Sequence, residues 1–200
     1  MDLPALIAAL SQPAAYPDPV AHVEVCQTHI SVVFLAEDVV YKIKKPVKLS
    51  FLDFSTLDLR GRFCDAEVRL NRRLAPDVYL GVVPITQTGS GLKFEGSGPP
   101  LEWAVKMRRL PEEATLEHLV VEGNVNGSQI AALARRIAGF HAAADTNPHI
   151  ATFGRFDAVA RNIRENFEVA APMVGRTVSA AVRTRLLELT ERALAGQRAL

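Results

Sequence analysis

The sequence has few cysteines and almost no net charge. Its two cysteines, Cys26 and Cys64, are too few for a disulfide framework and favour a reducing, cytoplasmic location. Together with the five histidines they show no zinc-type spacing. A net charge of +1 and the lack of aromatic pairs argue against a protein that binds nucleic acid through a basic strand.

Long hydrophobic runs are also absent. No stretch approaches the roughly 20 apolar residues of a membrane span, and the start Met1-Asp2-Leu3-Pro4 lacks the basic segment of a signal peptide. Apolar residues nevertheless make up 48% of the chain and charged residues 22%, which suits a packed core. The length of 200 residues fits one large domain or two small lobes.

The first half of the sequence indicates an antiparallel sheet. Residues 3–10 predict a short helix, and the proline-rich residues 12–19 predict a linker. Residues 88–100 are rich in Gly, Ser and Pro and predict an exposed hairpin tip around 92–94. Apolar and β-branched runs predict five strands, at residues 23–28, 30–35, 39–44, 80–85 and 102–107.

One main helix is predicted between the third and fourth of these strands. Residues 45–54 read as a loop anchored by apolar side chains, and residues 55–58 have the form of a capping box. Helical spacing of apolar residues then continues to about Leu74, and Pro76 ends the helix. The helix must turn its apolar stripe towards the sheet.

The composition changes from β-branched residues to Ala, Arg and Leu near Arg108–Pro111. We therefore predict an α+β protein with three parts, an N-terminal helix and linker (1–22), a β-rich lobe (23–108) and a helical part (109–200). Helical patterns occupy residues 115–122, 128–144, 156–170 and 178–200.

Lys42 and Lys44 are the first candidate binding residues. Strand alternation places them on one face together with Val40. An ammonium group between apolar residues is unfavourable unless it has partners, and phosphate oxygens and a carboxylate would serve. The alternative is an edge strand whose lysines are solvated.

Glu67 is the candidate carboxylate. It lies in the middle of the predicted helix, beside the apolar stripe that faces the sheet. The alternative is an ordinary solvated charge that pairs on the surface with Arg69, Arg72 or Arg73.

Two further segments are candidate ligand contacts. The turn Thr28–Ser31 carries small hydroxyl side chains and backbone amides that could cap phosphates at Ser31, or it is a plain strand break. The crossover Lys106–Leu110 could offer backbone groups to an adenine edge, with Met107 against the ring, or it is an ordinary linker.

These segments together resemble the bacterial aminoglycoside phosphotransferase family, many of whose members are fused to a C-terminal P-loop ATP-binding domain. The resemblance implies a protein-kinase-like fold with an antiparallel β N-lobe and the helical start of a C-lobe. It further implies ATP with Mg²⁺ as cofactors, and phosphorylation of a hydroxyl on a small molecule. By resemblance Lys42, with Lys44 as fallback, is the phosphate lysine and Glu67 its partner. The segments that carry the similarity are 28–35, 40–47, 51–57, 67–85, 102–111, 134–141 and 165–168.

The catalytic motifs of such a kinase are not found in the sequence. There is no His-Gly-Asp and no P-loop, and Asp157 and Asn162, which have a suitable spacing, lie in a predicted helix. We therefore expect no catalytic or metal-binding residue in this chain, and we read it as the first part of a longer kinase that stops before the catalytic loop. It should bind nucleotide weakly at most and associate through exposed helix faces. The alternative is a non-catalytic, pseudokinase-like binding or regulatory module.

Overall fold

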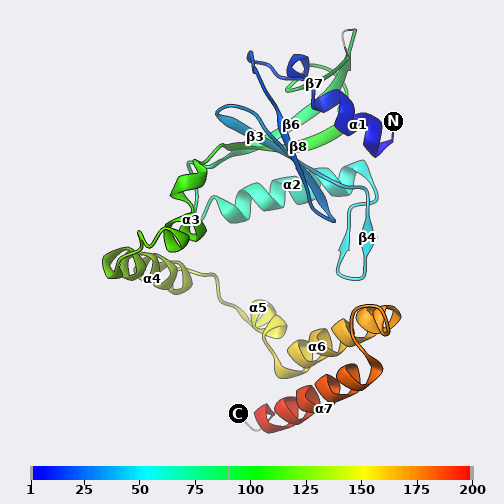
Figure 1. Ribbon diagram of the computed structural model, residues 1–200, viewed down its shortest axis with the longest axis vertical. Helices are drawn as coiled ribbons and strands as arrows, with labels where there is room; N and C mark the ends of the chain where they lie inside the picture. The colour runs from blue at the N-terminus through cyan, green and yellow to red at the C-terminus, as the bar shows by residue number, and fades with distance from the viewer. Residues whose placement is uncertain (1, 90, 199–200) are drawn as a thin grey trace. The chain divides into compact units, whose positions relative to one another are not determined.

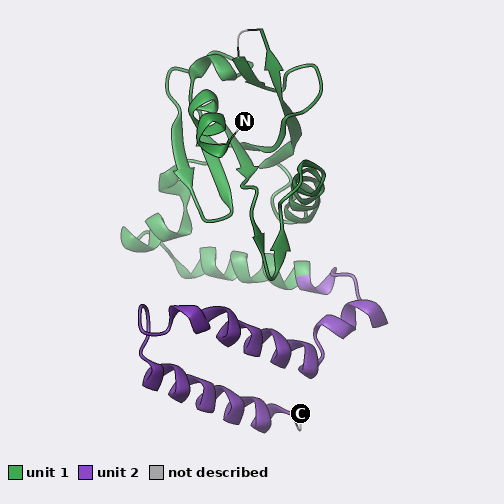
Figure 2. Cartoon of the chain, turned by 90° about the vertical axis from the view of Figure 1, so that its right-hand side faces the viewer, with its two compact units in different colours: residues 1–140 green, residues 141–200 purple. Residues whose placement is uncertain are grey.

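The computed structural model describes residues 2–89 and 91–198 of the chain. The chain divides into two compact units, residues 1–140 and residues 141–200, which Figure 2 distinguishes by colour. The first unit contains a curled antiparallel sheet with helices, and the rest of the chain is mostly helical, so the α+β class is confirmed. Within the described ranges, no helix is long and apolar enough to cross a membrane.

A six-stranded antiparallel sheet forms the centre of the first unit, with the strand order β1-β2-β3-β8-β6-β7 (Figure 1). A separate two-stranded hairpin is formed by β4 and β5. The strands are β1 (Glu24–Gln27), β2 (Ser31–Leu35), β3 (Val39–Lys44), β4 (Lys48–Leu49), β5 (Leu52–Asp53), β6 (Tyr79–Thr88), β7 (Gly91–Phe94) and β8 (Glu102–Arg108).

Strand β3, which carries the two candidate lysines, is an interior strand. Lys42 lies opposite Val33 of β2 on one side and opposite Val105 of β8 on the other. The edge-strand alternative for its lysines is therefore wrong. The side chains of an interior strand point out of the two faces of the sheet, so the lysines face the elements that pack on one of these faces.

Helix α1 (Leu3–Leu10) belongs to the core on one face of the sheet. Asp2 caps it by accepting a hydrogen bond from the backbone N–H of Ala5 at 2.9 Å. Within residues 12–19, which were expected to be a linker, Ala15 and Tyr16 are buried in this core. The prolines of this segment break the α-helix but leave a short 3-10 helix, Pro13–Ala15, in which Ala15 is buried.

The hairpin tip around residues 92–94 is not exposed, which corrects the prediction from sequence. Leu92 and Phe94 are buried in the core, and the Phe94 ring stacks on Tyr41 with 4.1 Å between ring centroids. The four-residue strand β7 alternates Leu92 and Phe94 inward with Lys93 between them. Its Gly-rich surroundings concealed this strand in the sequence, and position 90 lies outside the described residues.

The segment 45–54 also differs from the predicted loop. It forms the β4–β5 hairpin, and its apolar residues are not all anchors, because Phe51 is 75% exposed and Leu49 is exposed as well. Phe54 is the buried anchor. A chain reversal between two short strands turns the tip side chains away from the core.

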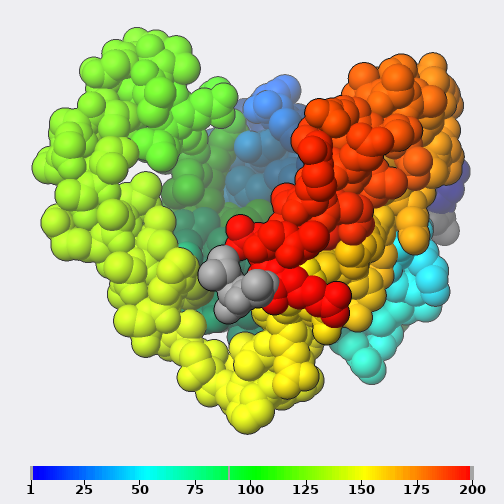
Figure 3. Space-filling view, turned by 90° about the horizontal axis from the view of Figure 1, so that it is seen from below, coloured from blue at the N-terminus to red at the C-terminus, as the bar shows by residue number. Residues whose placement is uncertain are grey.

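The second half of the chain is helical, as predicted, with one additional short helix, α5, that periodicity did not reveal. Helices α6 and α7 lie side by side in the second unit (Figures 1 and 3), joined by an ion pair between Arg164 and Glu191 at 2.7 Å. Residues 199 and 200, at the end of the predicted helix 178–200, lie outside the described residues. The helices are α3 (Leu116–Val121), α4 (Gly127–Ala142), α5 (Pro148–Phe153), α6 (Phe156–Ala170) and α7 (Ala180–Gln197).

Candidate functional site

The candidate site lies where helix α2 (Leu57–Asn71) crosses the face of the sheet that carries the strand lysines. Thr56 begins this helix by accepting a hydrogen bond from the N–H of Leu59 at 3.2 Å. The helix ends at Asn71 rather than at the predicted Leu74. Its inner residues Cys64 and Val68 pack with Val105 of β8 in a small buried cluster. This packing fixes which side of α2 meets the sheet.

A buried ion pair fastens the start of α2 to strand β8. The Nε of Arg60 donates to both carboxylate oxygens of Glu102, at 2.9 and 2.8 Å. The same guanidinium donates through Nη1 to the carbonyl oxygens of Phe54 and Ser55, at 2.9 and 3.3 Å. Both charged groups are therefore satisfied, and the helix is held where it leaves the β4–β5 hairpin.

One close approach sets the distance between α2 and the sheet. A Cβ placed on Gly61 would lie 2.9 Å from Cδ1 of Trp103 on β8. Real Cβ atoms do not come this close to another heavy atom, so a glycine is required at this helix position for the observed packing.

Glu67 extends from α2 towards β3 and binds both strand lysines at once. Its Oε1 accepts from Nζ of Lys42 at 2.8 Å, and its Oε2 accepts from Nζ of Lys44 at 2.7 Å. The side chain of Lys42 is 30% exposed, that of Lys44 only 7%, and that of Glu67 14%. The surface-pairing alternative for Glu67 is therefore wrong, because its carboxylate faces the sheet.

The two lysines keep Glu67 ionised although it is largely buried. Burial by itself raises the pKa of Glu67, but the hydrogen bonds from Lys42 and Lys44 and the charges of both ammonium groups outweigh it and lower the pKa. Two ammonium groups beside one carboxylate leave the cluster with a net charge of +1. Such a cluster attracts an anion.

Ser31 and Met107 lie on the same face of the sheet as the lysines. Ser31 is the cross-strand partner of Lys44, and Met107 is the cross-strand partner of Val40. Directly opposite residues in an antiparallel pair point to the same face. The structure thus brings all five sequence-predicted binding residues to one face, with Lys42, Lys44 and Glu67 in direct contact.

The turn before Ser31 is closed by its own side chains. Oγ1 of Thr28 accepts hydrogen bonds from the backbone N–H groups of Ile30 and Ser31, at 3.3 and 3.0 Å. Ser31 itself is buried. Two of the amides considered as phosphate caps are therefore already engaged within the turn.

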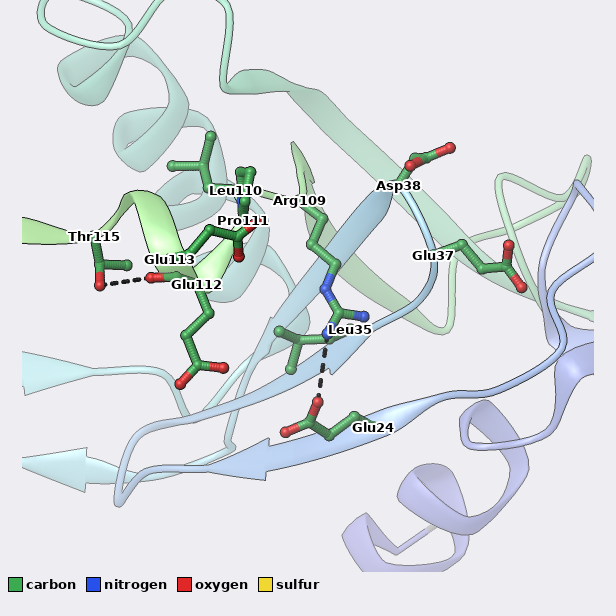
Figure 4. Close-up of a pocket in the computed structure, with 10 residues that line it drawn as sticks. All are labelled: Glu24, Leu35, Glu37, Asp38, Arg109, Leu110, Pro111, Glu112, Glu113 and Thr115. Atoms are coloured by element: carbon green, nitrogen blue, oxygen red, sulfur yellow. Dashed lines mark hydrogen bonds and ion pairs between the residues drawn. The ribbon is translucent and has the colours of Figure 1, made fainter. Parts of the chain in front are cut away.

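A cavity of about 740 Å³ lies beside the crossover that follows β8 (Figure 4). Its wall includes Arg109, which donates to the carbonyl oxygen of Ala36 at 2.9 Å and pairs with Glu24 at 3.5 Å. Sequence reasoning selected the crossover but missed the acidic character of the cavity, whose residues come from separate segments. The lining residues are Glu24, Leu35, Glu37, Asp38, Arg109, Leu110, Pro111, Glu112, Glu113 and Thr115.

The cavity and the lysine cluster are adjacent along the sheet. Leu35, which lines the cavity, lies opposite Val40, and Val40 is two residues from Lys42 on the same strand face. Two residues span about 7 Å along a strand.

Across residues 2–89 and 91–198, no group of three or more His, Cys, Asp or Glu side chains is arranged to hold a metal ion.

The fold and the site together define an α+β protein in which two strand lysines share one helix carboxylate. Uncharacterized protein Rv2004c of Mycobacterium tuberculosis and Uncharacterized protein Mb2027c of Mycobacterium bovis are each 34% identical to it over 178 residues. The match covers 89% of this chain and 34% of each relative, so the chain spans about a third of the length of these proteins. No family model and no solved structure matches the chain.

Proposed function

We propose that the first unit is the nucleotide-binding lobe of an ATP-dependent phosphotransferase with a protein-kinase-like fold, similar to the aminoglycoside phosphotransferase family. The observation that carries this proposal is the hydrogen bond of 2.8 Å between Lys42 on β3 and Glu67 on α2. In protein kinases a lysine on the third strand reaches the phosphates of ATP while a glutamate on the following helix holds it.

The order of elements supports the same proposal. The lysine strand β3 is the third strand of the sheet, α2 follows it, and the chain leaves the sheet after β8, which lies beside β3. The exposed fraction of Lys42 leaves its ammonium accessible to a phosphate, since a lysine has three N–H donors and Glu67 takes one.

The cavity beside the crossover is the proposed place of the nucleoside. It is lined by Arg109 and Leu110, and its lining residue Leu35 lies opposite Val40, two residues from Lys42 on β3. A nucleotide with its base in the cavity would direct its phosphates towards the lysine cluster. We propose Mg²⁺ as the cation that accompanies the nucleotide, as the family resemblance implies, and name no ligand for it in this chain.

The acceptor of the phosphoryl group is proposed to be a hydroxyl on a small molecule, of unassigned identity. Because no His-Gly-Asp motif occurs in the sequence, we propose nucleotide binding without turnover for the 200-residue chain. A non-catalytic binding module is the second candidate, supported by apolar side chains that are exposed on the helices and suited to association. They include Leu116, Val121, Ile130, Ile137, Phe153, Val159, Val182 and Leu186.

Calorimetric titration with ATP tests the proposed site. Lys42→Met should weaken ATP binding by about 10- to 150-fold, the effect of losing a hydrogen bond to a charged group. Lys44 remains to pair with Glu67 in this variant, so the fold should persist. The matched control is Lys48→Met, which removes a lysine that is 72% exposed on the β4–β5 hairpin.

These measurements distinguish the nucleotide-binding lobe from the non-catalytic binding module and can contradict both proposals. Equal ATP affinity in the wild type and Lys42→Met, or no measurable binding by either, would contradict the nucleotide site. Phosphorylation of any acceptor by the purified chain, lost in Lys42→Met, would contradict the absence of turnover. A stable complex with another chain, formed without ATP binding, would favour the non-catalytic module.

A further inference from the structure

We infer that Lys44 is a positioning residue that holds the Glu67 carboxylate while Lys42 donates to the phosphates. This inference rests on the proposed nucleotide site. It gives the two lysines different tasks, although both are within hydrogen-bond distance of the same carboxylate.

The first observation is that the lysines bind different oxygens. Lys42 takes Oε1 and Lys44 takes Oε2, so neither has to leave for the other to bind. When Lys42 also donates to another acceptor, the hydrogen bond of 2.7 Å between Lys44 and Glu67 holds the carboxylate.

The second observation is the difference in surroundings. The Lys44 side chain is 7% exposed, against 30% for Lys42. The ammonium of Lys44 also lies over the face of the buried Phe54 ring, 5.0 Å from its centroid, where the ring attracts a cation. Lys44 is therefore enclosed between a carboxylate and an aromatic ring, whereas Lys42 can reach a ligand.

The third observation is the charge of the cluster. A carboxylate that is 14% exposed is strongly destabilised if its only cation departs. With one lysine, Glu67 and a phosphate would share the donors of a single ammonium group, and the lysine–glutamate pair would be neutral. With two lysines, the cluster keeps a net charge of +1 and Glu67 keeps a partner throughout.

Two measurements test whether Lys44 positions Glu67 and Lys42 binds the phosphates. The first is the rate at which an amine-reactive acylating reagent modifies each lysine, measured by peptide mass spectrometry without nucleotide. The second is the ATP dissociation constant. In the wild type, Lys42 should be modified several-fold faster than Lys44, and ATP should protect Lys42.

In Lys44→Met, Lys42 is the one strand lysine that remains to bind the Glu67 carboxylate. We expect modification of Lys42 to slow by about threefold or more and ATP binding to weaken by about tenfold, the effect of one charged hydrogen bond. Lys44→Arg keeps the charge and should retain both values within about threefold. The control Lys48→Met should change neither, and Trp103 fluorescence reports whether each variant is folded.

Each outcome has a distinct meaning. An unchanged Lys42 modification rate and ATP affinity in Lys44→Met overturns the role of Lys44 and leaves the nucleotide site intact. No ATP binding by the wild type overturns the nucleotide site and, with it, the task assigned to Lys42. If Lys44→Met does not fold, a fall of Lys44→Arg to the ATP affinity of Lys42→Met overturns the inference.

Discussion

Removal of Glu102 should loosen the helix that carries Glu67. The two carboxylate oxygens of Glu102 share the single N–H of Arg60 Nε, and the side chains of the pair are only 6% and 10% exposed. Glu102→Leu leaves the guanidinium of Arg60 buried without its counter-charge. Because α2 begins beside this pair, the perturbation acts on the position of the candidate site as well as on stability.

The expected loss is about 3 kcal/mol of the free energy of unfolding. Breaking a buried ion pair by removing one partner costs about 3–5 kcal/mol. We take the lower end because Arg60 still donates to the carbonyl oxygens of Phe54 and Ser55. The double variant Arg60→Met/Glu102→Leu should recover most of the loss, because an apolar pair of similar volume leaves no unpaired charge.

Urea unfolding followed by the fluorescence of Trp103 measures this loss. Trp103 is the single tryptophan of the sequence and lies on β8, so the signal reports the sheet and α2. Arg62→Ala is the control, since its ion pair with Asp58 is exposed and should contribute less than about 1 kcal/mol. A loss below about 1 kcal/mol in Glu102→Leu, or a double variant as unstable as the single one, would contradict a stabilising role of this buried ion pair.

Three further predictions follow from buried groups. Gly61→Ala should destabilise the first unit by about 1–3 kcal/mol in the same urea titration, because the new Cβ would meet Trp103 at 2.9 Å; an unchanged midpoint would contradict this. The pKa of Glu67 is lowered in the folded protein. The ionised Glu67 side chain therefore stabilises the fold fully above pH 4.5, the ordinary pKa of a glutamate, and this stabilisation is lost as the pH falls through the lowered pKa. The stability advantage of wild type over Glu67→Gln should therefore shrink in acid, and a constant difference would argue against the ionised cluster. Cys26 is exposed and should react with a thiol reagent in the native protein. Cys64 is buried, which raises its pKa to about 12, so it should react only after unfolding. Rapid reaction of both cysteines in the native protein would be inconsistent with the fold.

Local patterns in the sequence predicted several elements with their bounds, among them the strand that carries the two lysines. Helix α1, strand β3 and helix α6 have the predicted bounds, because each has a clear period and a clear start or end signal. Strand alternation also placed Lys42 and Lys44 on one face correctly. The meeting of these lysines with Glu67 required the family resemblance, since the residues are 25 and 23 positions apart in sequence.

Features that depend on packing between distant segments were not predictable from local patterns. Tyr16 and Phe94 lie in segments rich in proline or glycine and looked exposed, yet their rings pack 5.1 Å apart in the core. The ion pair of Arg60 with Glu102 joins residues 42 positions apart. The acidic cavity likewise gathers side chains from β1, the β2–β3 turn and the segment after β8.

The role of Lys42 can be tested most directly by affinity labelling. An adenosine analogue that carries a sulfonyl fluoride in place of the phosphates reacts with an amine held at the phosphate position, and peptide mapping then identifies the modified lysine. We expect an adduct on Lys42 that is prevented by excess ATP and absent from Lys42→Met. A label distributed over exposed lysines such as Lys48, insensitive to ATP, would contradict it.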